Sequence, residues 1–192
     1  MATTSEVERL LSSVRATDDM SREIELAHEL GKLGDPAVDL LIAAIPDVLT
    51  RWAAVTALGR IGSSEAIASI IPICKDIDPT IRGAAVIALG KIGGEKIVPT
   101  MIDVVDTEEG GMIRTSAIQA LGAAGVPDPV EFLTALVEDP TRDKYDRREA
   151  TQALGSLGGD DVIASLRTFA ADDGDEYVRK FAAEALDALG AA

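Results

Sequence analysis

Few side chains in this chain of 192 residues could do acid–base, nucleophilic or metal chemistry, because it holds one His and one Cys. His28 and Glu29 are adjacent, and imidazole and carboxylate groups are common ligands of transition metals. A stable metal site needs three or four such ligands, so we expect His28 to be a surface residue rather than a ligand. Cys74 follows the apolar residues 70–73, which predicts a small buried thiol and excludes a disulfide within the chain.

The paired carboxylates are better explained by helix capping than by catalysis. Asp160–Asp161 and Asp172–Asp173 have the side chains for acid–base chemistry or calcium binding, but they fall at expected helix starts and turns. The glycine pairs at 93–94 and 158–159 lack the Lys and Ser or Thr that follow in a nucleotide-binding loop. We therefore expect no catalytic residue, no metal and no cofactor, and a chain that is not an enzyme.

The elements that must position these residues are indicated by an internal repeat. The string Ala-Leu-Gly occurs at residues 57–59, 88–90, 120–122 and 153–155, a period of 31 to 33 residues. An Arg stands seven residues before the repeated Leu in five copies, as Arg51, Arg82, Arg114, Arg147 and Arg179. Six copies cover the chain and predict a single domain over residues 1–192. Their approximate bounds are residues 5–34, 35–62, 63–93, 94–125, 126–158 and 159–192.

Each copy is expected to form two helices. Apolar residues make up 47% of the chain and aromatic residues 3%, a balance that suits closely packed helices. In the third copy, apolar residues over 63–76 have helical spacing. Pro72 falls inside this pattern and predicts a kink, as Pro99 does in the next copy. Asp78 then predicts an N-cap, and Pro79 the first residue of a second helix.

Three kinds of repeated residue predict how neighbouring copies meet. The Gly after the repeated Leu lies inside the second helix, where it costs about 1 kcal/mol relative to Ala, so its recurrence predicts a close approach of helix backbones. The aligned arginines are expected to form a ladder of charge-assisted bonds between copies, near the cap aspartates. The expected cap aspartates are Asp47, Asp78, Asp143 and Asp175.

The motif Asp-Pro-x-x-x-Arg-x-x-Ala-x-x-Ala-Leu-Gly-x-Ile-Gly, which residues 78–93 follow with small slips, resembles the HEAT-like repeats of phycobilisome lyases. The resemblance extends from about residue 5 to residue 192. It implies an all-α fold, a right-handed α-solenoid (superhelix) of six HEAT-like helical hairpins, similar to armadillo proteins, whose apolar faces are buried by stacking. A capping box at Ser5 and Glu8, and Asp187 in place of the repeated Gly, predict terminal copies adapted to water.

Two enzymatic relatives of this fold do not match the residues. Deoxyhypusine hydroxylases, which are also HEAT-like, bind two irons through several His–Glu pairs at the starts of second helices. This chain has the single pair His28–Glu29, later in its helix, so we expect the resemblance not to carry that activity. HEAT-like DNA glycosylases hold DNA with basic and aromatic residues, whereas a net charge of -15 opposes binding to phosphates.

A candidate binding surface follows from the repeat register. In HEAT-like arrays the second helices line the concave face, and residues six and two before the repeated Leu and two after it share one stripe. The predicted partner-binding residues are Ile24, His28, Lys32, Trp52, Thr56, Arg60, Ile87, Lys91, Gln119, Arg148 and Gln152. The stripe carries several cations in an acidic chain, which favours an acidic ligand. Trp52, with Ile24 and Ile87, supplies apolar anchors, although Trp52 could instead fill a packing gap.

These features predict a scaffold or adaptor for protein–protein interaction that binds an acidic or apolar segment of another protein on its concave face. The N-terminus lacks a signal-peptide pattern and no apolar run reaches about 18 residues, so we expect a cytoplasmic monomer that binds neither membranes nor nucleic acid. One alternative is a lyase-like or enzyme-accessory factor that binds a small molecule or chromophore in the same groove. Another is a structural element that assembles through its ends, which the polar terminal copies disfavour.

Overall fold

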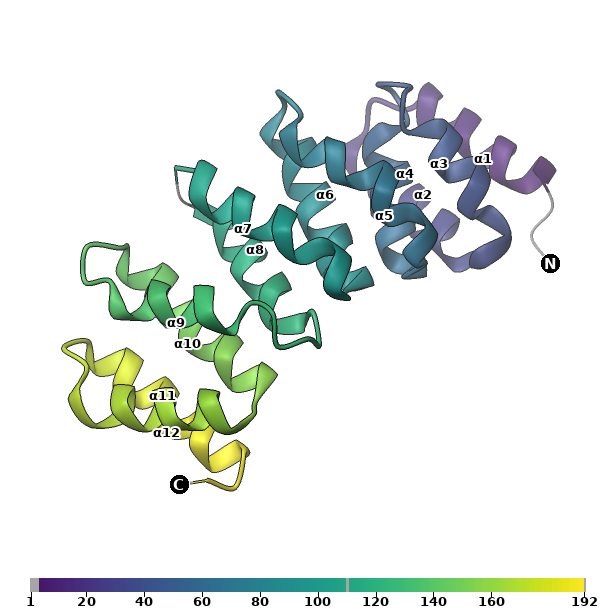
Figure 1. The fold of residues 1–192 in the computed structure, drawn as a ribbon. Coiled ribbons are helices and arrows are strands. Elements are labelled where there is room, and N and C mark those ends of the chain that lie inside the picture. The colour runs from purple at the N-terminus through teal and green to yellow at the C-terminus, as the bar shows by residue number, and fades with distance from the viewer. Residues whose placement is uncertain (1–3, 110, 192) are drawn as a thin grey trace. The chain divides into compact units, whose positions relative to one another are not determined.

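The computed structural model describes residues 4–109 and 111–191, and all regular structure within them is helical (Figure 1). Twelve α-helices and four short 3₁₀ helices follow one another in these residues, without a β-strand. The predicted all-α fold of stacked helical hairpins is confirmed. Contacts within the chain define two compact units, residues 1–93 and residues 94–192.

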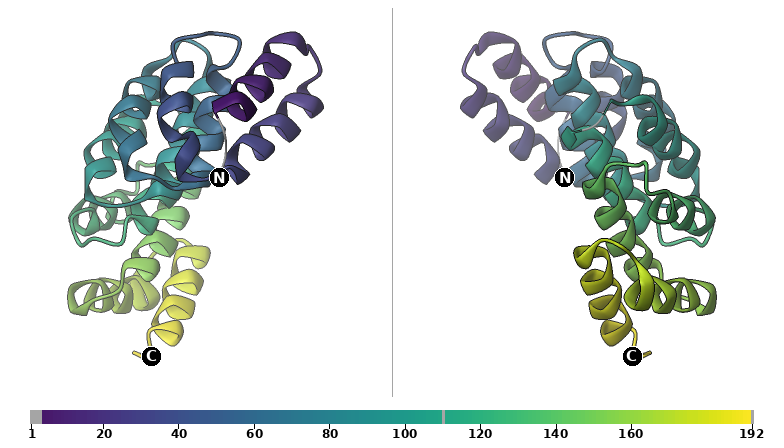
Figure 2. Two further views of the ribbon diagram at one scale, coloured as in Figure 1. Left: turned by 90° about the vertical axis from the view of Figure 1, so that its right-hand side faces the viewer. Right: turned by 90° about the vertical axis from the view of Figure 1, so that its left-hand side faces the viewer.

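The first unit consists of two layers of helices that alternate along the chain. Its second helices α2, α4 and α6 pack in that order, so that α4 contacts both α2 and α6. The first helices α1, α3 and α5 each pack against the second helix that follows them in the chain (Figure 2). The bounds are α1 (Thr4–Ala16), α2 (Met20–Lys32), η1 (Asp35–Ala37), α3 (Val38–Ala44), α4 (Arg51–Ile61), η2 (Ser64–Ala66), α5 (Ile67–Ile70), η3 (Ile71–Lys75) and α6 (Pro79–Ile92).

The second unit repeats this arrangement of first and second helices. Its second helices α8, α10 and α12 pack in that order, and each pairs with the helix before it. The bounds are η4 (Glu95–Ile97), α7 (Val98–Thr107), α8 (Gly111–Ala123), α9 (Val130–Glu138), α10 (Lys144–Leu157), α11 (Asp160–Asp172) and α12 (Glu176–Ala188). No helix among the described residues has the length and apolar content needed to cross a membrane.

The repeated Leu of each copy forms the centre of the core. It is fully buried in five copies, as Leu30, Leu58, Leu89, Leu121 and Leu154. Full burial of such a side chain contributes about 1.5–3 kcal/mol, so one Leu per hairpin is a regular source of stability along the chain. Cys74 is also buried, as predicted.

The repeated glycines bring neighbouring second helices into backbone contact. A Cβ placed on Gly59 would lie 2.6 Å from the Cα of Ala88, and one on Gly122 would lie 2.7 Å from the Cα of Ala153. At Gly155 the nearest atom would be the Cβ of Ala185, at 2.7 Å. The predicted close approach is therefore confirmed within both units.

Three of the four predicted aspartate caps are present. Asp78, Asp143 and Asp175 accept hydrogen bonds from the backbone N–H two residues later, at 2.7, 2.7 and 2.8 Å. The prediction for Asp47 is wrong, because α4 begins at Arg51, and Asp47 instead accepts from the Leu49 N–H in the turn before it (3.0 Å). Sequence analysis missed Asp19, which caps α2 by accepting from the Ser21 N–H.

The two predicted proline kinks have different outcomes. At Pro72 the α-helical hydrogen bonding stops, and the expected single helix over residues 63–76 is divided into η2, α5 and η3. Pro99 does not kink a helix, because α7 begins at Val98 and Pro99 lies in its first turn. The missing proline donor has no helical partner in a first turn, so Pro99 is tolerated there.

Candidate binding surfaces on the second helices

The predicted partner-binding residues all lie on second helices and none of them is buried. Eight belong to the first unit, on α2 (Ile24, His28, Lys32), α4 (Trp52, Thr56, Arg60) and α6 (Ile87, Lys91). Three belong to the second unit, Gln119 on α8 and Arg148 and Gln152 on α10. The structure thus supports the predicted helical face, while a binding role for these residues stays a prediction.

In the first unit, apolar side chains reach solvent on three adjacent helices. Ile24 on α2 is 38% exposed and Ile87 on α6 is 44% exposed, and Trp52 is half-buried on α4, which packs between those two helices. We call the exposed side of α2, α4 and α6 that carries these residues the amino-terminal face. It offers one apolar side chain on each of three neighbouring helices.

Three cations occupy the other end of the amino-terminal face. Lys32, Arg60 and Lys91 lie in the last turns of α2, α4 and α6, where the helix dipole favours positive charge. None of the three forms an ion pair or a side-chain hydrogen bond with a residue that the structure describes. The stem of Arg60 packs over Gly31, since a Cβ on Gly31 would lie 2.9 Å from the Cβ of Arg60. The three charges are therefore available to a ligand.

His28 does not belong to a metal site in the residues that the structure describes. Its neighbour Glu29 lies 3.8 Å from Arg22, which also pairs with Glu25 at 2.8 Å. Within residues 4–109 and 111–191 no three His, Cys, Asp or Glu side chains are grouped so that they could hold one metal ion. Two irons bound through several His–Glu pairs do not fit this set of residues.

Three of the five aligned arginines form the expected ion pairs between neighbouring copies. Arg51 pairs with Asp76 at 2.8 Å, and Arg114 pairs with Asp146 at 2.8 Å. Arg147 pairs with Asp173 at 2.6 Å. The other two aligned arginines donate to backbone carbonyls of their own copies, Arg82 to Asp76 (3.0 Å) and Arg179 to Asp173 (2.6 Å). These bonds confirm a structural role for the arginines.

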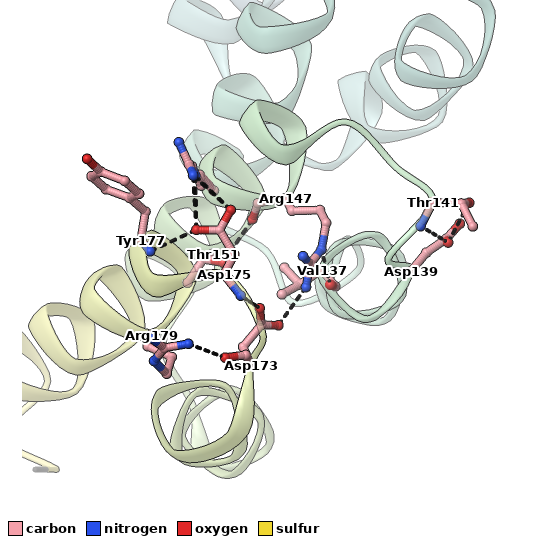
Figure 3. A network of polar contacts seen from close by, with 10 residues as sticks. Val137, Asp139, Thr141, Arg147, Thr151, Asp173, Asp175, Tyr177 and Arg179 are labelled. Carbon is pink, nitrogen blue, oxygen red and sulfur yellow. Dashed lines mark hydrogen bonds and ion pairs between the residues drawn. The ribbon is translucent and has the colours of Figure 1, made fainter.

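The ladder differs from the prediction in its acceptors. The carboxylates that pair with the aligned arginines are not the cap aspartates but lie two residues before the cap, as at Asp76 and Asp173, or three after it, as at Asp146. Figure 3 shows one such junction, in which Asp173 lies between Arg147 and Arg179. Asp173 also accepts from the backbone N–H of Asp175 (2.8 Å). One carboxylate therefore binds both an arginine of the ladder, Arg147, and the backbone of Asp175, the residue that caps α12.

Arg148 is held within the second unit by Asp175 and two tyrosines. Its guanidinium forms a bidentate pair with Asp175, with distances of 2.8 and 3.1 Å to Oδ2. It also lies 4.2 Å from the ring centre of Tyr177 and 5.7 Å from that of Tyr145. Burial opposes ionisation of Asp175, but the hydrogen bonds from Arg148 and from the Tyr177 N–H outweigh it and lower the pKa of the Asp175 carboxyl. The charge of Arg148 is thus neutralised, while the tyrosine rings stay accessible.

Sequence analysis missed the aromatic residues of the second unit. Tyr145 and Tyr177 are 59% and 44% exposed, and Met112 on α8 is 79% exposed. Each lies nine residues before the repeated Leu, one turn beyond the predicted stripe, so extending the stripe by a turn would have found them. Gln119, which was predicted, donates to Glu149 on α10 (3.0 Å).

The exposed apolar side chains are confined to one side of the hairpins. Among the described residues, every exposed large apolar side chain lies on a second helix or in the turn before one. These residues are Met20, Ile24, Val48, Leu49, Ile77, Ile87, Met112, Tyr145 and Tyr177. The first helices present polar and small residues to solvent instead. Apolar exposure of this kind is a mark of binding surfaces.

Comparison with protein families identifies the repeat. A family model described as HEAT repeats matches residues 7–78, 38–122, 67–145 and 111–187. A deoxyhypusine hydroxylase of Danio rerio is 32% identical over 102 residues, covering 53% of this chain and 33% of the relative. One of Drosophila pseudoobscura pseudoobscura is 29% identical over 76 residues, 38% of this chain and 25% of the relative. The chain therefore spans a third or less of the curated relatives that it matches.

Solved structures share the fold. In the complex of CpcE and CpcF of phycocyanin lyase from Nostoc sp. PCC7120, the matching chain has a TM-score of 0.63 and 24% identity, covering 99% of this chain and 78% of that one. A designed armadillo repeat protein in complex with a (KR)4 peptide has a TM-score of 0.59 and 15% identity, with coverage of 95% and 99%. At these identities the likeness concerns the fold.

The expectation that the chain is not an enzyme is corrected by the sequence relatives. Both matching relatives are named deoxyhypusine hydroxylase, which is an enzyme. The expectation rested on the small number of groups capable of chemistry in this chain. That inventory describes the residues present and does not place the chain outside a family that includes enzymes.

Proposed function

Since the chain belongs to the HEAT-repeat family, we propose that it is a binding protein whose amino-terminal face holds an acidic and apolar segment of another protein. The observation that supports this most is the confinement of exposed large apolar side chains to the second helices and the turns before them. A surface that had only to be soluble would have no reason to collect them on one side. Enzymes and adaptors both need such a face, so the proposal applies to either.

The chemistry of the amino-terminal face defines the segment. Ile24, Trp52 and Ile87 provide one apolar contact on each of three adjacent helices, suited to apolar side chains spaced along the segment. Lys32, Arg60 and Lys91 provide one cation at the end of each helix, suited to carboxylates at one side of it. The apolar contacts would supply most of the affinity, and the charges would set orientation and association rate.

A peptide selection followed by measured affinities tests this proposal. The immobilised chain selects from a library of random displayed peptides, and the dissociation constants of the enriched peptides are measured by fluorescence anisotropy. We expect peptides that combine acidic and large apolar residues. Arg60→Gln with Lys91→Gln should weaken their binding about tenfold, since two charge-assisted contacts are lost.

The matched control removes the same charge from another place. Lys96→Gln with Arg167→Gln changes the net charge equally, but these residues lie in η4 and α11, outside the amino-terminal face. We expect this control to change the dissociation constant less than about twofold. Equal weakening by both pairs, or enriched peptides with no acidic or apolar preference, would refute the proposed surface.

A further inference from the structure

A pocket of about 450 Å³ lies between the amino-terminal ends of α8 and α10, within the second unit. Glu109 lines it together with Met112 and Thr115 of α8, and Asp143, Tyr145 and Asp146 at the start of α10 complete the lining. We propose that this pocket holds a lysine or arginine side chain from a basic segment of a partner protein. The site is separate from the amino-terminal face and depends on none of its residues.

The charge of the pocket favours a cation. Three carboxylates line it, those of Glu109, Asp143 and Asp146, against the single guanidinium of Arg114. The Asp146 side chain is 5% exposed and pairs with Arg114 through Oδ2, while its Oδ1 accepts no hydrogen bond from a described residue. A carboxylate oxygen that lies outside its ion pair can accept from an ammonium or guanidinium group of a ligand.

The apolar part of the pocket suits the stem of the same side chain. Tyr145 presents its ring at 59% exposure, and Lys144 and Arg148 already place cations 5.2 and 5.7 Å from its centre. Rings of this kind attract cations through their π faces. Met112, 79% exposed, offers a flexible apolar surface against which a methylene chain can pack. Carboxylates, an aromatic ring and a thioether together match Lys or Arg better than an apolar residue.

The surface beside the pocket can accept the rest of the segment. Arg148 contacts the rings of Tyr145 and Tyr177, and Asp175 cancels its charge, so the two helices α10 and α12 share an exposed aromatic platform. Residues 94–192 contain nine Lys and Arg against 20 Asp and Glu, a net charge of -11, whereas residues 1–93 contain nine against 13, a net charge of -4. The second unit therefore attracts a basic segment from a distance.

A second hollow in the same unit serves as an internal comparison. It lies on the first helices α9 and α11, with a volume of about 580 Å³, and is lined by four carboxylates that include Glu131 and Asp161. Neither an aromatic residue nor a Met lines it. An acidic cluster without these groups attracts cations but offers no specific site for one. Removing charges from this hollow therefore distinguishes general charge attraction from specific binding in the pocket.

The test is the affinity of the full chain for a labelled octapeptide of alternating Arg and Ser, measured by fluorescence anisotropy at low, constant salt. Glu109→Gln with Asp143→Asn removes two pocket charges, and Asn preserves the cap of α10. We expect this pair to weaken binding about tenfold or more. Tyr145→Leu keeps an apolar residue but removes the π face, and should weaken binding about threefold to tenfold.

The control pair Glu131→Gln with Asp161→Asn changes the net charge by the same amount in the other hollow, and should weaken binding less than about twofold. Tyr145 is mostly exposed, so its replacement leaves the fold intact and circular dichroism of each variant verifies this. Equal weakening of octapeptide binding by the two double substitutions would refute the proposed role of the pocket. So would an unchanged affinity in Tyr145→Leu, or equal binding of an octapeptide of alternating Glu and Ser.

Discussion

Replacing Gly59 by Ala tests whether the solenoid depends on backbone contact between second helices. The added methyl group would lie 2.6 Å from the Cα of Ala88 and 2.7 Å from its Cβ, whereas carbon atoms pack best at about 3.5–4.0 Å. No side-chain rotation relieves a contact with a Cα atom. Helices α4 and α6 would have to separate by about 1 Å, and such a gap loses a quarter to a half of the attraction between the atoms that line it.

Two opposing effects set the size of the loss. Overpacking costs about 1–3 kcal/mol and more against backbone, so we take about 3–4 kcal/mol here. Ala is favoured over Gly inside a helix by about 1 kcal/mol, which leaves a net loss of about 2–3 kcal/mol in the free energy of unfolding. In a chain of this length that corresponds to about 4–12 °C in melting temperature.

Urea denaturation followed by far-UV circular dichroism measures this loss, with two comparison variants. Gly174→Ala has no atom within 4 Å of its new Cβ and should be neutral or slightly stabilising. Gly155→Ala meets the Cβ of Ala185 at 2.7 Å but its Cα only at 3.7 Å, so it should lose less than Gly59→Ala. A Gly59→Ala chain as stable as Gly174→Ala would refute the role assigned to the repeated glycine.

Two further predictions follow from the arginine ladder and its carboxylates, and a third from the amino-terminal face. Arg147→Ala leaves Asp173, whose side chain is 8% exposed, without its ion-pair partner and should destabilise the chain by about 3–5 kcal/mol in urea denaturation, and Asp173→Asn in the same chain should recover part of that loss. A hydrogen bond from the Asp78 N–H, aided by Arg51, lowers the pKa of Asp76 below its unfolded value of about 3.9, so stability is full above that pH and falls as the pH drops through the folded pKa. Asp76→Asn should flatten the acid limb of a stability–pH curve; an unchanged slope would contradict the assignment. Binding of an acidic and apolar peptide should change Trp52 fluorescence, and a constant spectrum at saturation would count against the amino-terminal face.

The sequence by itself determined the elements of this protein. The spacing of Leu, Gly and Arg predicted second helices that meet along their backbones, because in a repeat each hairpin contacts only its neighbours and the same local constraint recurs in every copy. Gly59 against Ala88 and the bond from Arg147 to Asp173 are instances of it. The predicted partner-binding residues also fell on positions outside the core, because helical periodicity fixes which side of a helix faces the core.

Only the tertiary structure decided which charged side chains are neutralised by an ion-pair partner. Lys32 and Arg148 are both cations on the predicted stripe, yet Lys32 pairs with no described residue while Arg148 is held bidentate by Asp175, 27 residues away. The tyrosine pair and the pocket above Asp146 likewise need residues from two helices at once. Periodicity assigns a side chain to a face, but its partner depends on the register between helices. That register is set by packing at contacts such as Gly155 on Ala185, which one sequence position cannot specify.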